Sequence, residues 1–356
     1  MARRIRRPLG PLDLRSQAIL RAVIEEYVAT ATPVGSQALV ERYRLGVSSA
    51  TVRNILAELE AAGLLQHPHT SAGRMPTDAG YRFYVESIVE SAPLPPVEQL
   101  MIRHQFGQVE FASEHWFRLA ATTLAGLTRS AGIATPAKPS AAHIRRIDLV
   151  AVNERLASLI LVLREGSIKQ AVVNLDEADT VDQATLNRVA GMLNDRLHDL
   201  TASRADALLA RLADADPIER LARRVGERIL RIMRDYDAAA VEEVFSDGLL
   251  NVMEAPEFAQ SDKLRQVFSV LENRAYLGEL VGSVAATGRI HVLIGAENPS
   301  VEMHDVSLVL APYGRPGRAI GVVGVLGPTR MSYPQAIGTV RFVSGLMNEL
   351  VDHLYA

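Results

Sequence analysis

The pattern of apolar residues in the first ninety positions constrains the fold more than any other feature of this sequence. Apolar pairs recur at every fourth position after Asp13, which is the spacing of one helical face behind an N-cap. A second helix is expected to begin at Ser36, and a third is expected to be capped by Ser48 or Ser49. The apolar residues that define the first and third helices are Ile19, Leu20, Val23, Ile24, Tyr27 and Val28, then Val52, Ile55, Leu56 and Leu59.

A short strand-turn-strand pattern follows these helices. Gly63 suits the left-handed position after a helix, residues 64–66 are strand-like, and residues 67–74 are rich in turn formers. Met75 begins the returning strand, and Thr77 can cap a fourth helix. Three helices with a tight turn between the second and third, followed by a small hairpin, predict a winged helix-turn-helix domain over residues 1–90.

This arrangement gives specific side chains a role in DNA binding. The third helix of such a unit enters the major groove, where Arg and Asn can bind guanine and adenine edges with two hydrogen bonds each. Hydroxyls at a helix N-terminus and the small polar residues of a hairpin tip suit phosphate or minor-groove contact. The predicted DNA-binding residues are Ser36, Ser48, Ser49, Thr51, Arg53, Asn54, His69, Thr70, Ser71 and Arg74. The alternative interpretation is a solvated helix face and a polar turn.

Beyond residue 90 the sequence alternates helical and strand-like segments. A proline-rich linker is expected at 91–97 and a helical segment at 98–130. Strand-like runs occupy 147–152, 157–164 and 168–175, and three helices are predicted within 182–238, with breaks near Thr201 and Asp216. Residues 241–282 are predicted to be mostly helical, followed by strands at 289–295, 305–311 and 318–326 and by a final helix from about Ser332.

Composition excludes several classes of protein. With no cysteine, the chain has no disulfide scaffold, thiolate zinc site or cysteine nucleophile. No apolar run approaches the ~18 residues that span a bilayer, and the N-terminal arginines are followed by Pro8, Gly10 and Pro11, where an export signal needs an apolar stretch. We therefore expect a cytoplasmic protein with no membrane contact. Residues 1–80 hold ten arginines against seven acidic residues, a net of +3 in a chain of net −3, as expected if only this end meets phosphates.

Motifs for enzyme chemistry are missing from the sequence. The glycine-rich run from Gly314 to Gly327 lacks the Gly-Lys-Ser/Thr of a Walker loop and the setting of a dinucleotide fingerprint. There is no nucleophile elbow, no His-Glu-x-x-His and no paired-carboxylate motif. We expect neither an enzyme, nor a cofactor, nor a metal site.

Several runs resemble the bacterial heat-inducible transcription repressor family, HrcA. In the first ninety residues these are Ser48-Ser-Ala-Thr-Val-Arg-Asn54, Leu59-Glu-Ala-Ala-Gly-Leu-Leu65, Pro68-His-Thr-Ser-Ala-Gly-Arg-Met-Pro-Thr77 and Gly80-Tyr-Arg-Phe-Tyr-Val85. Near the end they are Leu293-Ile-Gly-Ala-Glu-Asn298, Ser307-Leu-Val309 and Gly324-Val-Leu-Gly-Pro-Thr-Arg-Met331. Ser332 stands where the family pattern usually has Asp, a mild departure because both residues cap helices. Residues 176–240 carry little that matches.

The resemblance implies a dimer that binds an inverted-repeat operator in double-stranded DNA upstream of chaperone operons. It also implies that the chaperonin maintains activity and that heat stress removes it. The expected fold is α+β: a winged helix at 1–90, a linker at 91–97, a GAF-like domain at 98–145 and 241–356, and an inserted α/β dimerisation domain at 146–240.

Two other functions remain open from the residues alone. The chain could be a winged-helix regulator whose GAF-like domain senses a small molecule, which ligand-dependent release of the operator would reveal. It could also use the winged helix to bind a protein, which the absence of salt-sensitive DNA binding would favour.

Overall fold

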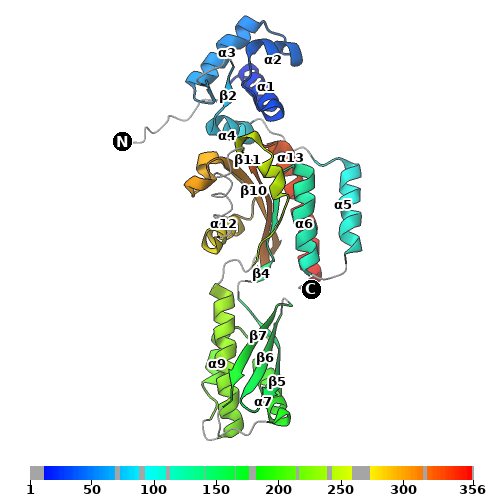
Figure 1. Ribbon diagram of the computed structural model, residues 1–356, viewed down its shortest axis with the longest axis vertical. Helices are drawn as coiled ribbons and strands as arrows, with labels where there is room; N and C mark the ends of the chain where they lie inside the picture. The colour runs from blue at the N-terminus through cyan, green and yellow to red at the C-terminus, as the bar shows by residue number, and fades with distance from the viewer. Residues whose placement is uncertain are drawn as a thin grey trace, which may run out of the picture.

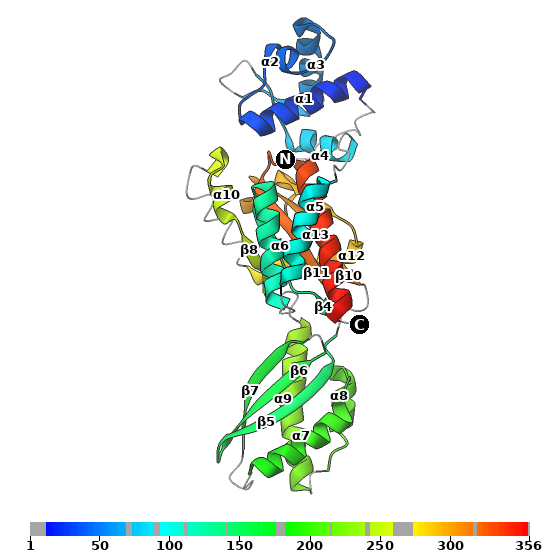
Figure 2. The ribbon, with the colours of Figure 1, turned by 90° about the vertical axis from the view of Figure 1, so that its right-hand side faces the viewer.

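The chain folds into three regions arranged along one axis, which we call the head (residues 12–87), the body (93–139 with 243–354) and the insert (141–238) (Figures 1 and 2). The structure, a computed structural model, describes residues 12–68, 73–87, 93–109, 113–139, 141–164, 166–175, 182–213, 216–238, 243–258, 273–315 and 319–354. Helices and antiparallel sheets together make an α+β fold. None of the helices in these ranges is long and apolar enough to cross a bilayer.

The head contains the elements that the sequence predicts. They are α1 (Leu14–Thr30), α2 (Ser36–Arg42), α3 (Ser49–Ala61), β1 (Leu65–Gln66), β2 (Met75–Pro76) and α4 (Asp78–Ser87). The Asp13 carboxylate accepts the Ser16 N–H at 2.7 Å, and this bond lowers the pKa of Asp13. Gly63 has φ +76°, as its predicted place after α3 requires. The strands β1 and β2 pair antiparallel, with Leu65 opposite Pro76.

The body is built on a six-stranded antiparallel sheet. Five strands follow the order β8-β3-β11-β10-β9, and β4 pairs with the first two residues of β11, Ala319 and Ile320. The strands are β3 (Ala131–Ala134), β4 (Lys138–Pro139), β8 (Phe245–Asp247), β9 (His291–Ile294), β10 (Val306–Arg315) and β11 (Ala319–Pro328). The hairpin of β10 and β11 is paired over ten residues on each strand, so it forms the centre of the sheet.

Helices cover both faces of this sheet. One face packs against α6 (Ser113–Thr128) and α13 (Tyr333–Leu354), and α5 (Pro96–Gln108) lies beside them (Figure 2). The other face packs against α10 (Leu249–Met253), the 3-10 helix η1 (Pro256–Phe258) and α12 (Arg274–Thr287). Two short 3-10 helices, η2 (Gly295–Glu297) and η3 (Val301–Met303), connect β9 to β10.

The insert leaves the body between two strands that are neighbours in space. Strand β3 pairs with β8, although the whole insert separates them in sequence. The insert has its own sheet of order β5-β6-β7, made of β5 (Ile144–Asn153), β6 (Leu156–Leu163) and β7 (Ile168–Asn174). Its helices α7 (Gln183–Leu197), α8 (Ala202–Leu209) and α9 (Pro217–Ala238) enclose a separate hydrophobic cluster with the inner face of that sheet. The strands near 147–175 therefore belong to the insert.

The sequence prediction differs from the structure in the elements that come just before and just after the insert. The segment 98–130 is two helices, and the first begins at Pro96, where proline is compatible with a helix because its missing N–H has no helical partner there. Strands β3, β4 and β8 were not predicted, and β8 lies in a segment expected to be helical. These strands are short, and they contain residues of low strand propensity: alanine and glycine in β3, proline in β4, and aspartate in β8. Only their neighbours in the sheet make them strands.

Helix α6 explains why β3 contains a glycine at position 132. A Cβ atom on Gly132 would lie 2.0 Å from the carbonyl oxygen of Ala121 in α6. The helix therefore approaches the strand more closely than any side chain larger than hydrogen allows.

We predict that Gly132→Ala lowers the free energy of unfolding by about 1–3 kcal/mol, because the added methyl group forces α6 away from the sheet. The matched control is Gly126→Ala in α6, which has open space around it and should raise the free energy of unfolding by about 0.5–1 kcal/mol. Urea unfolding of the three proteins measures both effects. Equal midpoints for Gly132→Ala and wild type would show that the close approach is not a constraint.

Candidate nucleic-acid interface

The second and third helices of the head form a fixed pair at the end of the molecule farthest from the insert (Figures 1 and 2). The hydroxyl oxygens of Ser36 in α2 and Ser49 in α3 are 3.1 Å apart and share a hydrogen bond. Leu39 and Val52 are fully buried beneath them. The start of α3 is therefore held at a defined place relative to α2.

The N-terminus of α3 presents hydroxyl groups and backbone donors together. Ser48 is the N-cap, and its Oγ accepts the Thr51 N–H at 3.2 Å. The Thr51 hydroxyl lies 3.0 Å from the same oxygen. The other N–H groups of the first turn have no helical acceptor, and the helix dipole makes this end positive. Such an end attracts an anionic group such as a phosphate.

One face of α3 carries exposed side chains at helical spacing. Arg53 and Asn54 are exposed, and Ala50 and Ala57 lie next to them on the same face. The opposite face packs into the head, with Val52, Ile55, Leu56 and Leu59 buried. The Arg53 guanidinium makes no ion pair or hydrogen bond with any residue that the structure describes, so its donors can reach a ligand.

Arg74 lies at the other end of α3. Its Nε is 2.7 Å from Glu60 Oε2, and the side chain is only 18% exposed. The backbone of Arg74 pairs with Val34 through two hydrogen bonds of 2.8 and 2.9 Å. Ser48 and Glu60 are twelve residues apart, about 18 Å along a helix at ~1.5 Å per residue, so Arg74 does not join the cluster at the start of α3. The ion pair between Arg74 and Glu60 attaches the base of the hairpin to α3.

The predicted tip of the hairpin, His69, Thr70 and Ser71, lies outside the described residues. The base of the hairpin lies within the described residues. A Cβ atom on Gly73 would lie 2.6 Å from the backbone of Pro33, so glycine is needed where the returning strand crosses the segment between α1 and α2.

Sequence reasoning missed four residues at this site. Ala50 and Ala57 complete the exposed face, and their spacing from Arg53 and Asn54 could have identified them. Arg44 is exposed in the turn before α3, where a positive charge is near the same surface. Glu60 could not be identified from the sequence, because only the folded structure brings it next to Arg74.

Comparison with known proteins places the chain in a family. The model of the HrcA protein C-terminal domain matches residues 114–337. A heat-inducible transcription repressor HrcA from Chloroflexus aurantiacus is 41% identical over 357 residues, covering 97% of this chain and 95% of the relative. The Herpetosiphon aurantiacus protein of that name is 42% identical over 346 residues, covering 97% and 96%.

A solved structure has the same fold. It is a crystal structure described as that of a hypothetical protein, with a TM-score of 0.61 and 23% identity, covering 97% of this chain and all of that one. Because this chain is 41% and 42% identical to these two HrcA relatives over nearly its whole length, the resemblance seen in the sequence is confirmed: the chain belongs to the heat-inducible transcription repressor family HrcA.

Proposed function

We propose that this protein represses heat-shock operons by binding double-stranded operator DNA through its head. The observation that carries the proposal is the exposed face of α3, where Arg53 and Asn54 stand beside a hydroxyl-rich helix N-terminus. In the proposal, α1 to α3 with the β1–β2 hairpin are a winged helix-turn-helix, and α3 enters the major groove. The named function of the relatives, transcriptional repression, fits this assignment.

Each predicted residue has a place in this assignment. Arg53 and Asn54 read base edges, whereas Ser48, Ser49, Thr51 and Ser36 hold the phosphate at the start of α3. The hairpin tip, with His69, Thr70 and Ser71, contacts the neighbouring backbone or minor groove, and Arg74 supports that contact from the hairpin base.

The body and insert have separate roles in the proposal. The body, with its antiparallel sheet covered by helices on both faces, is the GAF-like domain, and the insert is the dimerisation domain, interrupting the body between β4 and β8. A dimer fits an inverted repeat because a single winged helix reads only one half-site.

The outer face of the insert's sheet is the proposed dimer interface. Val150, Ile168 and Val172 are 47%, 68% and 57% exposed on the face opposite the helices, and Val150 and Val172 flank Ser158 in register. Strand β5 lies at the edge of the sheet, and side chains of α7 already take up its outward backbone groups. The Asn194 amide hydrogen-bonds to the N–H and the carbonyl of Ile147, and the Gln183 amide hydrogen-bonds to the Leu149 carbonyl and the Ala151 N–H. A second copy would therefore bury the apolar face, not add a strand to that edge.

The regulatory part of the proposal rests on the family. The repressor is active in the cytoplasm at normal temperature, the chaperonin maintains it in a DNA-binding state, and heat stress removes that activity so that chaperone genes are expressed.

We predict that Asn54→Ala reduces discrimination at one operator base pair by about 1–3 kcal/mol and leaves binding to scrambled DNA unchanged, because the lost contact is to a base. Arg74→Ala should weaken operator and scrambled duplex by similar factors, since it loosens the hairpin. Salt titrations on both duplexes measure these effects, using an operator that wild-type protein selects from random DNA. Val52→Ala, at a fully buried position, is the packing control and should lower stability without changing the preferred bases. If Asn54→Ala weakens both duplexes equally, α3 does not read bases at this position.

We predict that Val172→Lys converts the dimer to a monomer at micromolar concentration, because a charge would be buried in the apolar interface. Val301→Lys, at a 73% exposed position of the body, is the matched control and should remain dimeric. Sedimentation equilibrium distinguishes the species. A dimeric Val172→Lys protein would place the interface elsewhere.

We predict that operator binding by freshly refolded protein rises when chaperonin and ATP are added. The control is chaperonin without ATP, which should give little gain. Titration with labelled operator gives the active fraction. If a preparation that is only partly active does not respond, the chaperonin does not maintain this protein.

A further inference from the structure

The head is not merely tethered to the body; α4 is bonded to the loop after β9. The Arg82 guanidinium donates from Nε to Glu297 Oε1 at 2.8 Å and from Nη2 to the second oxygen of the same carboxylate. The same Nη2 donates to the Val292 carbonyl at 2.5 Å. The hydrogen bonding to the Glu297 carboxylate raises the pKa of Arg82. One turn earlier, Asp78 Oδ2 accepts the N–H of Ala296 at 2.9 Å.

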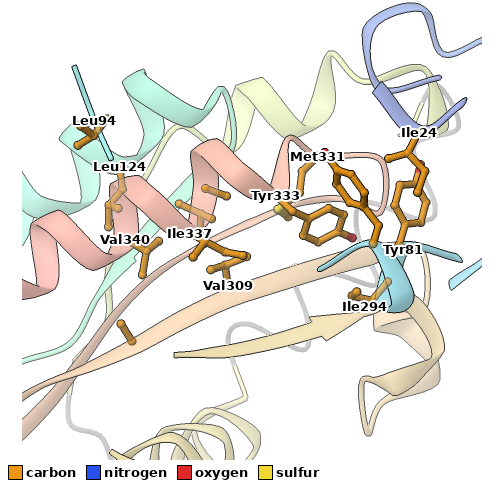
Figure 3. Close-up of a cluster of buried hydrophobic side chains, with 14 of the residues drawn as sticks. Ile24, Tyr81, Leu94, Leu124, Ile294, Val309, Met331, Tyr333, Ile337 and Val340 are labelled. Carbon is orange, nitrogen blue, oxygen red and sulfur yellow. The ribbon is translucent and has the colours of Figure 1, made fainter. Parts of the chain in front are cut away.

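A second set of contacts joins α1 and α4 to the segment after β11 and to the first residue of α13. Arg330 donates from Nη1 to the Val28 carbonyl at 3.1 Å and pairs through Nε with Glu257. The rings of Tyr81 and Tyr333 are 5.6 Å apart. Figure 3 shows these two rings in one apolar cluster with Ile24 from the head and with Ile294 and Met331 from the body.

The loop after β9 is shaped to fit the head. Gly295 has φ +49°, and a Cβ atom there would lie 2.5 to 2.6 Å from all three carboxylate atoms of Asp78. A side chain at this position would thus displace Asp78 and its bond to Ala296. The contact depends on glycine here for space as well as for backbone conformation.

We propose that this head–body contact, made by Asp78, Tyr81 and Arg82 with residues 292–297 and 330–333, fixes the orientation of the head and thereby selects the spacing between operator half-sites. The inference rests on the proposed function. Helix α3 is joined to α4 through the buried core of the head, so a tilt at the contact moves α3 with it. In a two-fold dimer the two third helices fit only half-sites at a matching separation. A loosely attached head would accept several separations.

Two pairs of variants isolate this contact. Gly295→Ala disturbs it from the body side, and its control Gly288→Ala has the same left-handed backbone, with φ +64°, but open space around it. Arg82→Ala disturbs it from the head side. Its control Arg21→Ala also removes one positive charge from the head, but Arg21 forms its ion pair with Glu25 in the same helix. The controls therefore match backbone strain and net charge.

The first measurement needs no DNA. Because the chain has no cysteine, Ala57→Cys and Val301→Cys place one spin label on α3 and one on the body at exposed positions. We expect a narrow distance distribution in the labelled wild-type background and in both controls, and a broadened or shifted one in Gly295→Ala and Arg82→Ala. Circular dichroism confirms that each variant is folded.

The second measurement compares affinities for inverted repeats whose half-sites are identical and whose spacers differ in length. We expect the preference of wild type for one spacer to fall by about 3- to 30-fold in Gly295→Ala and Arg82→Ala, and to persist in the controls. Binding to a single half-site should match that of the respective control.

The outcomes separate the two proposals. Unchanged distances and unchanged spacer preference in both contact variants would overturn the inference while leaving operator binding intact. If wild type binds no inverted repeat more tightly than a single half-site, the proposed function fails and the selection of spacing fails with it. Broadened distances in the contact variants would then still identify a contact that orients the head.

Discussion

The antiparallel pairing of β10 and β11 is the interaction on which the rest of the structure depends. Its ten paired residues supply the central strands of the body, and both faces are buried under helices. Glycines allow the close packing of this hairpin. A Cβ atom on Gly324 would lie 2.4 Å from the Val309 carbonyl oxygen, and one on Gly321 would overlap the Tyr313 ring. The glycines in this run are therefore explained by packing, because neighbouring backbone and side-chain atoms leave no space for a Cβ atom.

The same hairpin connects the sheet to the head. Strand β11 ends at Pro328, and Arg330, Met331 and Tyr333, the first residue of α13, contact α1 and α4. From there α13 runs back over the sheet. On the other side, β9 pairs with β10 and ends in the loop that holds Asp78 and Arg82. Burial raises the pKa of Tyr81 well above its ordinary value, so this ring stays neutral inside the contact. Strands β11 and β9, which lie on either side of β10 in one sheet, thus both end against the head, and a displacement of either strand changes where α3 lies.

Much of the fold could be predicted from local sequence signals, because those signals act over a few residues. The caps Asp13 and Ser48, the left-handed Gly63 and the apolar faces of α1 and α3 locate the head's helices, and the apolar run Leu156–Leu163 locates β6 in the insert's sheet. Strands β3 and β8 could not be predicted, since Ala131-Gly-Ile-Ala134 becomes a strand only between β8 and β11. Their pairing spans the whole insert, and no local pattern encodes a contact of that length in sequence.

The candidate site divides in the same way. Arg53 and Asn54 follow from helical periodicity, because a residue outside the apolar face of a short surface helix is exposed wherever the helix packs. The surroundings of Arg74 and Arg82 do not follow from it, since Glu60 and Glu297 reach them only through the hairpin crossing and the head–body contact. Periodicity thus identifies the groups that meet a ligand, whereas the groups that hold them in place are determined by tertiary structure. In the proposed function, in which a dimer reads two half-sites at once, the second set decides whether the first set reaches both sites together.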